Sequence, residues 1–499
     1  MQSVRDHGAF PLALISRAGW ACATTALVLA MLVNGCATAP TAVAPRIELA
    51  TCSRPWSQEP LRCGAYDVFE DREHKGRKLR LDLIVIPAKN GHAVKDPIFW
   101  FTGGPGQTAT QTVWLPNSWM HDEHDIVMLD ERGTSAANRL DCRTPGTADN
   151  LQGYLELPYT AEIARACARD LSPVADLSQY STAASVADVD EVRRALGYER
   201  INVVGASFGT YAALMYMRAH PDAVRSAVFY SIVIPANRVP LFHSAAAQRA
   251  LDRIEAECEQ DAACNVAYPD FREEFTAVLA KVRAGPVATA VPHPVSKAST
   301  PITLTEPAFV DAIRVLLYSA ESAHELPGLV HQAFLGDFAP IATAGFNASY
   351  GFYPDMRLGL TFAITCTEFT SRIGADEIDR AARGSFLGTW RVRGQYEACR
   401  EWPRTHLPDG FLDPFTSAVP TLIISGDSDP VIPPEWGEAA KAFLPNAIHA
   451  VVPGGHVPYN ECTEHIAAAV VGAGRTQGID IACLQQQRPP PFKPADTAH

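Results

Sequence analysis

The chain has 499 residues, 47% of them hydrophobic and 19% charged, which is enough for one large globular domain or two to three ordinary ones. Lysine and arginine total 42 against 55 aspartates and glutamates, a formal net charge of −13. This acidic balance, without any basic run along the chain, argues against binding to nucleic acid or to an anionic membrane surface.

The N-terminus has the pattern of an export signal. Arg5 and Arg17 precede the apolar stretch AGWACATTALVLAMLVNG, a short span with a basic flank that is typical of a signal peptide. Its ending, LVNGC, resembles the lipobox of bacterial lipoproteins, in which Cys36 carries the lipid and begins the mature protein. The alternative is an uncleaved anchor. Either way we expect an exported protein of the cell envelope, and Ala37, where some inner-membrane lipoproteins have aspartate, favours the outer membrane.

Cysteine usage agrees with export. The sequence has 12 cysteines, and ten remain after setting aside Cys22 in the signal and Cys36 at the lipobox. An even number of cysteines in an oxidising compartment predicts disulfides between neighbours along the chain. The neighbours are Cys52 and Cys63, Cys142 and Cys167, Cys258 and Cys264, Cys366 and Cys399, and Cys462 and Cys483. The alternative, a metal site, is disfavoured because neither a CxxC nor an HExxH motif occurs.

Short apolar runs predict strands in the first half of the chain, over 81–87, 97–101, 125–130, 201–205 and 224–233. Helical patterns lie between them. One lies within 181–199 and is expected to end at Gly197, and another follows Ser207 and stops at Pro221. Apolar strands that alternate with helices predict an α/β fold with a parallel sheet covered on both faces.

The pattern changes after residue 235, where helix-like segments become frequent and strand alternation fades. Strand signals return at PTLIISG and HAVVPGG near the C-terminus. We therefore predict one α/β core interrupted by a large helical insertion. The expected segments are a signal peptide over 1–36, a tether over 37–50, core over 51–235, a helical cap over 236–405 and core again over 406–499.

The segment INVVGASFGTYAALMY predicts a nucleophilic serine. It places the motif G-x-S-x-G between an apolar strand and a helix, where Ser207 would occupy a sharp, strained turn. Gly205 and Gly209 would remove the side chains that collide in such a turn. The motif alone is common by chance, so its strand and helix context carries the prediction.

A serine hydroxyl needs a base to accept its proton and an acid to orient that base. In chains with this turn the order is serine, acid, histidine. Downstream, SGDSDP and VVPGGH place aspartates and a histidine after successive strands. We predict a triad of Ser207, Asp429 and His456. The alternative acid, Asp427, is better explained as a turn cap.

Two backbone amides are needed to stabilise the oxyanion that forms during acyl transfer. One would come from Phe208, directly after the nucleophile. The other would come from the loop FTGGPG, where Gly103 and Gly104 expose amides at the end of a strand. A phosphate-binding loop is the alternative for a glycine-rich turn, but GK[ST] and GxGxxG are both missing from this sequence.

These motifs together resemble a known family. FTGGPG resembles the HGGPG loop of prolyl iminopeptidases, with Thr102 in place of histidine, and LDERGTSAAN resembles their DQRGTGxS stretch. The C-terminal part, from CREWP through SGDSDPVIPP to GGHVPYNEC, is similar to the tripeptidyl-aminopeptidase-like region of exported bacterial hydrolases. The resemblance covers nearly the whole mature chain. It implies an α/β-hydrolase fold with a mostly parallel central sheet and a large helical cap.

The resemblance also implies residue roles. Ser207, Asp429 and His456 match the family triad, and Gly104 and Phe208 match its oxyanion hole. The family's C-x-E motif appears here as CTE, which makes Glu368 a candidate for binding a substrate's α-ammonium group. Phe369 stands where the family has a second acid, so a purely structural role of Glu368 is the alternative.

Two further residues are expected to be structural. Arg132, in the stretch DERGTS, would brace the oxyanion loop through carboxylates or carbonyls. Trp402 would pack beneath the insertion.

The expected activity is that of an exported serine hydrolase that cleaves peptide bonds near a free N-terminus, without metal or organic cofactor. A carboxylesterase that acts on small or xenobiotic esters is the alternative, because the same triad cleaves both and the cap selects the substrate. An inactive, surface-anchored binding protein is a third hypothesis. The expected partners are a peptide or small ester substrate and the membrane through the lipid anchor only.

Overall fold

The structure is a computed structural model that describes residues 46–89, 91, 93 and 96–492. The predicted signal peptide, Cys36 and the first part of the tether lie outside the described residues. Within the described part, none of the helices combines the length and the apolar character that crossing a membrane requires.

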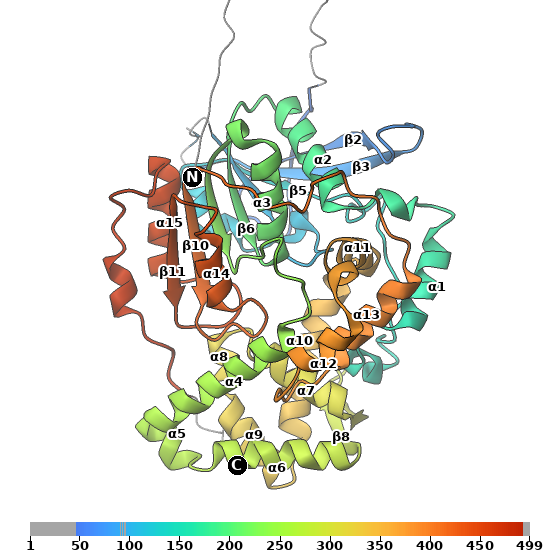
Figure 1. The fold of residues 1–499 in the computed structure, drawn as a ribbon, viewed down its shortest axis with the longest axis vertical. Helices are drawn as coiled ribbons and strands as arrows, with labels where there is room; N and C mark the ends of the chain where they lie inside the picture. Colours follow the sequence, from blue (N-terminus) through green and yellow to red (C-terminus); the bar gives the residue numbers. More distant parts are fainter. Residues whose placement is uncertain (1–45, 90, 92, 94–95, 493–499) are drawn as a thin grey trace, which may run out of the picture. The chain divides into compact units, whose positions relative to one another are not determined.

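A nine-stranded sheet forms the centre of the described chain, in the order β1-β2-β3-β5-β4-β6-β7-β10-β11 (Figure 1). The strands β1 to β3 and the β3–β5 pair are antiparallel, and every pair from β5 to β11 is parallel. The predicted mostly parallel sheet is therefore confirmed. The strands are β1 (Ala50–Cys52), β2 (Leu61–Phe69), β3 (Lys78–Ile86), β4 (Ile98–Phe101), β5 (Ile126–Leu129), β6 (Ile201–Ala206), β7 (Val224–Tyr230), β10 (Thr421–Gly426) and β11 (Ala447–Val452).

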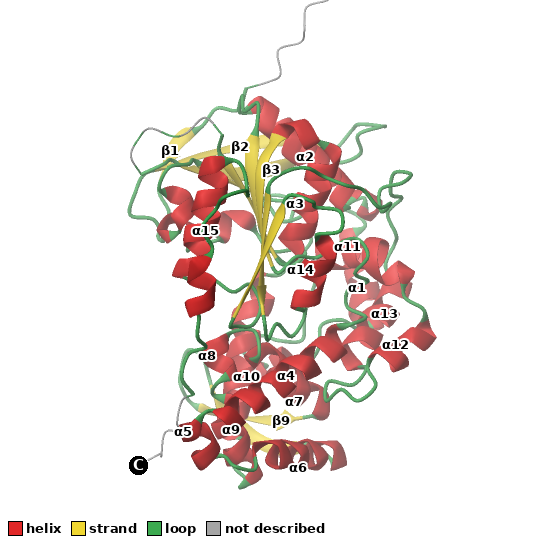
Figure 2. Ribbon diagram, turned by 60° about the vertical axis from the view of Figure 1, so that its left-hand side comes forward, coloured by secondary structure: helices red, strands yellow, loops and turns green. Residues whose placement is uncertain are grey.

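Helices cover both faces of this sheet, as Figure 2 shows with the sheet seen nearly edge-on. The covering helices include α2 (Thr182–Ala195), α3 (Phe208–Ala219), α14 (Pro434–Ala440) and α15 (Glu461–Ala473). Successive strand residues point to opposite faces. In β4, Phe99 joins the apolar cluster on one face, while Ile98 and Trp100 join the cluster on the other. This two-sided burial explains why the central strands are continuous apolar runs.

Between β7 and β10 the chain forms the predicted helical insertion together with an unpredicted hairpin of β8 (Val287–Pro292) and β9 (Ser299–Leu304). Its helices are α4 (His243–Gln260), α5 (Ala262–Ala267), α6 (Phe271–Ala284), α7 (Glu306–Leu316), α8 (Ala320–Ala323), α9 (Leu326–Phe334), α10 (Ala339–Phe352), α11 (Leu358–Ile364), α12 (Ala375–Ala381) and α13 (Trp390–Glu401). In Figure 1 the arrowheads of β10 and β11 point toward α4 and α8, so the insertion lies at the carboxyl end of the sheet.

The insertion packs in two parts. Phe309, Ile313 and Phe346 belong to an apolar cluster that the insertion builds mostly from its own helices. Phe362 of α11 belongs instead to the main apolar cluster, which packs on the same face of the sheet as Phe99. The helix α1 (Ala161–Leu171), which precedes the insertion in sequence, also packs in the main cluster and contacts α11 and α13. The helices that pack together near the carboxyl end of the sheet therefore come from segments far apart in sequence.

Disulfides tie neighbouring segments together. The described chain forms five, which join the neighbours expected from sequence: Cys52–Cys63, Cys142–Cys167, Cys258–Cys264, Cys366–Cys399 and Cys462–Cys483.

Candidate active site

Ser207 lies on the sharp turn between β6 and α3. Its backbone has φ 55° and ψ −126°, a strained conformation for a residue with a side chain. A Cβ at Gly209 would lie 2.0 Å from the Phe101 carbonyl oxygen, and one at Gly205 would lie 2.7 Å from the Gly209 carbonyl oxygen. Both neighbouring glycines are thus required for the turn, and the turn lifts the Ser207 side chain away from the strand.

Hydrogen bonds hold this strained turn in place. The Ser207 amide donates to the Tyr230 carbonyl at 2.9 Å. The Thr210 hydroxyl donates to the Ser207 carbonyl at 2.6 Å and accepts from the Val233 amide at 2.9 Å. The turn is therefore fixed both to the adjacent strand β7 and to the loop that follows it.

Asp429 lies on the loop after β10, fully buried. Its Oδ2 lies 2.9 Å from His456 Nδ1, and because an ionised carboxylate can only accept, the imidazole donates this hydrogen bond. Its Oδ1 accepts from the amides of Val431 and Ile432 at 2.9 and 2.8 Å. These bonds fix the carboxylate. They also hold the imidazole through Nδ1, so Nε2 is the ring nitrogen that is not bound to Asp429.

Asp427, the alternative acid, points elsewhere. Its Oδ1 accepts from the Gly454 amide at 3.1 Å, and its Oδ2 forms an ion pair with Arg253 of α4 at 2.8 Å. The side chain thus joins the loop after β10 to the loop after β11 and to the cap. Its geometry fits the turn-capping role considered for it from sequence.

Ser231, which sequence reasoning missed, links the aspartate to the histidine loop. It follows β7 with φ 56°, and its hydroxyl donates to Asp429 Oδ2 at 2.8 Å while accepting from the Val457 amide at 2.9 Å. Since no local motif marks this residue, only the fold could reveal it.

The loop after β4 passes beside the nucleophile. A Cβ at Gly103 would lie 3.5 Å from Ser207 Cβ and 2.8 Å from Gln107 Oε1. Gly104 has φ 122°, and a Cβ there would lie 2.5 Å from the Gly106 amide nitrogen. Phe208 is the first residue of α3, so its amide has no acceptor within that helix. These residues stand beside Ser207, where the sequence predicts the oxyanion donors.

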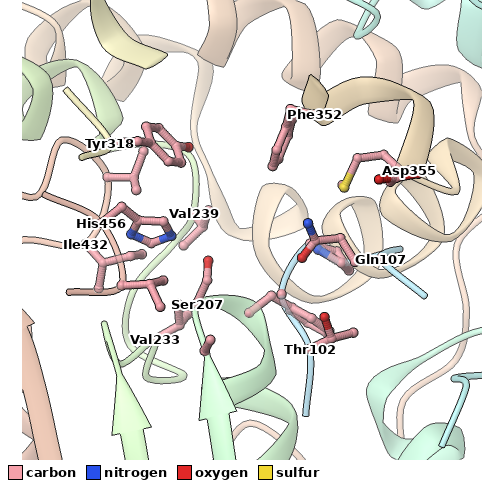
Figure 3. Close-up of a pocket in the computed structure, with 18 of the residues that line it drawn as sticks. Thr102, Gln107, Ser207, Val233, Val239, Tyr318, Phe352, Asp355, Ile432 and His456 are labelled. Carbon is pink, nitrogen blue, oxygen red and sulfur yellow. The ribbon is translucent and has the colours of Figure 1, made fainter. Parts of the chain in front are cut away.

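Ser207 and His456 line one cavity of about 460 Å³, together with Gly103, Gly104 and Phe208. Figure 3 shows Ser207 on its floor between His456 and Gln107, with Asp355 on the side away from His456. Within the described residues, no hydrogen bond joins Ser207 to His456. In serine hydrolases this hydrogen bond often forms only when substrate binds. A cavity of this size accommodates a short peptide segment or a small ester.

The insertion also positions the histidine. The His456 amide donates to the Tyr318 carbonyl at 2.7 Å, and the two rings meet edge to face with centroids 5.0 Å apart. A Cβ at Gly455 would lie 2.4 Å from the carbonyl oxygens of Leu317 and Tyr318. The histidine loop therefore packs directly against the end of α7.

Glu368 is not brought into the cavity. It is fully buried one layer behind the wall, where Oε1 accepts from the Thr182 amide at 2.7 Å and Oε2 from the Tyr211 hydroxyl at 2.9 Å. Burial raises the pKa of its carboxyl from 4.5 to about 7. Among the described residues that line the cavity, the acid is Asp355, which the sequence analysis did not single out.

Arg132 braces the sheet rather than the oxyanion loop. Its guanidinium binds both carboxylate oxygens of Asp188 on α2, at 2.7 and 2.9 Å, and donates to the carbonyls of Glu70 and Gln179. The prediction that carboxylates and carbonyls hold it matches these bonds, but they connect β5 to α2 and to the strand pair β2–β3.

Trp402 is buried, and its ring packs 5.2 Å from that of Phe362 on α11. It therefore lies beneath a helix of the insertion, where the sequence analysis expected it.

A mostly parallel sheet that carries a serine on such a turn, with an aspartate and a histidine on later loops, defines the class of α/β hydrolases. Residues 96–271 match the family model described as alpha/beta hydrolase fold. Residues 385–483 match the model described as TAP-like protein. The chain therefore has an α/β-hydrolase fold and, over residues 385–483, a segment similar to TAP-like proteins.

Characterised relatives are distant. A tripeptidyl aminopeptidase of Streptomyces coelicolor is 26% identical over 212 residues, which are 38% of this chain and 38% of that protein. The serine protease Hip1 of Mycobacterium tuberculosis is 26% identical over 226 residues, 40% of this chain and 42% of that protein. The chain thus spans less than half the length of the curated relatives it matches.

Among solved structures, the proline iminopeptidase of Mycobacterium smegmatis aligns over 82% of this chain and 98% of its own. The sequence identity is 15% and the TM-score 0.38, a similarity too low to carry an inference about this chain.

Proposed function

We propose that this protein is a serine hydrolase that cleaves peptide bonds near the free N-terminus of its substrate. The observation that carries the proposal is the buried Asp429–His456 hydrogen bond, 2.9 Å long, whose imidazole lines the same cavity as Ser207 on its strained turn. The arrangement is consistent with a nucleophile and a base in one pocket, with an orienting acid buried behind the base.

In the proposed reaction, His456 accepts the Ser207 proton as the hydroxyl oxygen attacks the substrate carbonyl. The amides of Gly104 and Phe208 stabilise the negative charge that develops on the carbonyl oxygen. The protonated imidazole then gives its proton to the departing amine, and the acyl group stays on Ser207 as an ester. Water, deprotonated by His456, hydrolyses that ester, while Asp429 keeps the imidazole oriented throughout.

The preference for a peptide with a free N-terminus rests on the named activities of the relatives and on an acid at the cavity wall. Asp355 is exposed and lines the cavity on the side away from His456 (Figure 3), where its carboxylate could bind an α-ammonium group. Glu368, the candidate from the resemblance, has both carboxylate oxygens engaged behind the wall. We therefore assign amine binding to Asp355 and keep Glu368 as the alternative.

We further propose that the protein is exported and anchored by lipid at Cys36. The apolar N-terminal stretch with its LVNGC ending supports this assignment, and five disulfides in the described chain fit an oxidising compartment.

The test compares a tripeptidyl 4-nitroanilide that has a free amine with its N-acetylated twin. Wild type should prefer the free amine by at least about tenfold in kcat/KM, and Ser207→Ala should abolish turnover of both substrates. Asp355→Asn should remove the preference. Asp409→Asn, at an exposed acid that does not line the cavity, is the matched control and should retain it.

Two outcomes would redirect the proposal. If Glu368→Gln rather than Asp355→Asn removed the preference, amine recognition would belong to the buried acid. If neither anilide reacted while a p-nitrophenyl ester did, with Ser207→Ala inactive, the carboxylesterase alternative would replace the peptidase.

A further inference from the structure

Two polar side chains in the cap wall of the cavity lack hydrogen-bond partners. Arg391, near the start of α13, and His243, the first residue of α4, both line the cavity, with exposed fractions of 7% and 6%. Within the described chain, Arg391 Nε and Nη1 and both ring nitrogens of His243 are buried without a hydrogen bond. Neither residue takes part in the proposed acyl-transfer steps.

The Arg391 guanidinium lies over the Tyr159 ring, 5.0 Å from its centroid, but has no carboxylate within hydrogen-bond distance. Its nearest carboxylate is that of Asp311, at 3.7 Å from Nη1, beyond hydrogen-bond distance. Asp311 already forms an ion pair with Arg314, whose Nε donates a hydrogen bond to its carboxylate at 2.7 Å. Two buried guanidinium groups therefore share one buried carboxylate, which leaves the cap wall with an excess positive charge.

His243 contributes a neutral ring beside this charge. Burial, reinforced by the positive charges of Arg391 and Arg314, holds its pKa well below the usual 6.5. The neutral imidazole has one N–H donor and one acceptor nitrogen, and neither is used within the described residues. The donor can complement a guanidinium in binding an anion.

Burying a guanidinium without hydrogen bonds is costly, and such a group in a native cavity calls for a ligand that completes it. The acids around the cavity do not fill this role. Among the described residues, neither Asp355 nor Asp429 forms an ion pair with Arg391, and both oxygens of Asp429 already accept hydrogen bonds from other groups. A carboxylate matches the planar fork of a guanidinium.

We infer that Arg391 and His243 form an anion subsite that binds a carboxylate of the substrate. This inference rests on the proposed hydrolase function and narrows its substrates to acidic ones. The carboxylate has two possible sources with the same chemistry: an acidic side chain in the peptide, or the C-terminal carboxylate of a short peptide.

The test uses the full chain and two pairs of substrates. The first pair is the free-amine anilides Ala-Ala-Glu-4-nitroanilide and Ala-Ala-Gln-4-nitroanilide, which differ only in a side-chain carboxylate. The second pair is a neutral hexapeptide as its free acid and as its C-terminal amide. In one pair the carboxylate member should be preferred about tenfold to a hundredfold in kcat/KM, the range expected for a charge-assisted hydrogen bond.

Variants assign the preference to this subsite. Arg391→Met should lower it to about twofold or less, whereas Arg391→Lys, which keeps the charge, should retain part of it. Arg393→Met on the same helix, which removes a half-exposed arginine paired with Asp379, is the matched control and should keep it fully. The Asp311–Arg314 pair stays balanced in Arg391→Met, so we expect a folded variant, and a thermal unfolding scan checks this.

Calorimetry separates this inference from the proposed function. In a Ser207→Ala background, which cannot acylate, the hexapeptide acid and the tripeptide Ala-Ala-Glu-amide are titrated against their neutral twins. If the carboxylate ligand binds more tightly than its neutral twin, and Arg391→Met removes this difference, the subsite is supported even if the wild type hydrolyses none of the substrates. Equal binding of acid and neutral twins, or a preference that survives Arg391→Met, would overturn the inference even if Ser207-dependent hydrolysis is found.

Discussion

At the scale of single residues, the two aspartates of the loop after β10 differ in what their carboxylates contact. Asp429 is fully buried and binds His456, while Asp427 is partly exposed and pairs with Arg253 and the Gly454 amide. A buried carboxylate that accepts an imidazole N–H sets the tautomer and stabilises the imidazolium that forms in the reaction. A carboxylate paired at the surface contributes little to stability.

Exchanging each aspartate for asparagine should therefore give unequal losses. Asp429→Asn should lower kcat by about 10³–10⁴-fold, because the imidazole is then held in the wrong tautomer. Asp427→Asn should stay within about threefold of wild type, since it loses only a partly exposed ion pair and one hydrogen bond. Steady-state kinetics on a p-nitrophenyl ester measures both, and similar losses in the two variants would contradict the assignment of the acid.

Glu368 gives a pH-dependent prediction. Its folded pKa of about 7 exceeds the 4.5 of an unperturbed glutamate, so the folded state keeps a proton that the unfolded state loses. The contribution of this group to stability is thus present below about pH 4.5 and is lost as pH rises to about 7. Glutamine cannot ionise, so Glu368→Gln should gain about 1–3 kcal/mol in unfolding free energy relative to wild type between pH 5 and pH 8.

Denaturant unfolding of both proteins across this pH range measures the difference. Parallel stability curves would show that burial does not penalise the Glu368 charge. An unchanged KM for a free-amine anilide in the same variant would support a structural role, and a raised KM would support the role in amine binding.

At the scale of elements, the cap helices hold the loops of the site in place. Arg249 of α4 donates to the carbonyls of Asp427 and Asp429, at 2.6 and 2.9 Å. The carbonyl of Tyr318, just after α7, accepts a hydrogen bond from the His456 amide. The acid loop and the histidine loop are therefore both anchored to the insertion. The insertion positions the site as well as forming its wall.

Loss of the α4 anchor should impair catalysis. Arg249→Met removes both bonds to the backbone of the acid loop and should lower kcat about tenfold, with faster hydrogen exchange over residues 427–432. Arg253→Met, one turn along the same helix, removes only side-chain pairs with Asp427 and Glu257 and should have a smaller effect. Equal effects of the two substitutions, or none, would contradict this anchoring.

The sequence predicted the central elements well because their signals are local. The runs over 97–101, 125–130 and 201–205 correspond to β4, β5 and β6, whose burial on both faces leaves a continuous apolar pattern. It missed β2, an antiparallel strand near the sheet edge that is only partly buried along most of its length, and the exposed hairpin β8–β9. Strands with a solvated face lack the continuous apolar run on which the predictions rested.

The candidate site divides in the same way. Ser207, Asp429 and His456 were identifiable because each stands in a motif at the end of a strand. Ser231 and Arg391 were not, because their environment is made by segments distant in sequence that meet only in the fold. Glu368 was singled out by motif, yet one layer of packing separates it from the cavity.

At the scale of the whole molecule, the disulfides relate stability to the compartment in which the chain folds. The five closed loops span 6 to 33 residues, and each disulfide restricts the unfolded chain. The longest of these loops is closed by Cys366–Cys399. This disulfide joins segments that contribute Thr365, Phe369 and Arg391 to the cavity wall. Reduction should therefore affect both the stability of the chain and the shape of its pocket.

Protein purified from an oxidising compartment should have all ten of these cysteines blocked. Alkylation followed by mass spectrometry should modify none of them before reduction and all ten afterwards. Exchanging both Cys366 and Cys399 for serine should lower the unfolding free energy by about 3–4 kcal/mol, as expected for a loop of this length. Free thiols in active, folded enzyme would contradict a structural role for the disulfides.

We propose that Ser207, His456 and Asp429 act together as a catalytic unit. Covalent labelling of the full chain with a fluorophosphonate, mapped by mass spectrometry, tests this role because it requires an activated serine but no knowledge of the substrate. We expect a single adduct on Ser207 that is absent in Ser207→Ala and forms far more slowly in His456→Ala. No adduct, an adduct at another residue, or equal labelling in His456→Ala would contradict it.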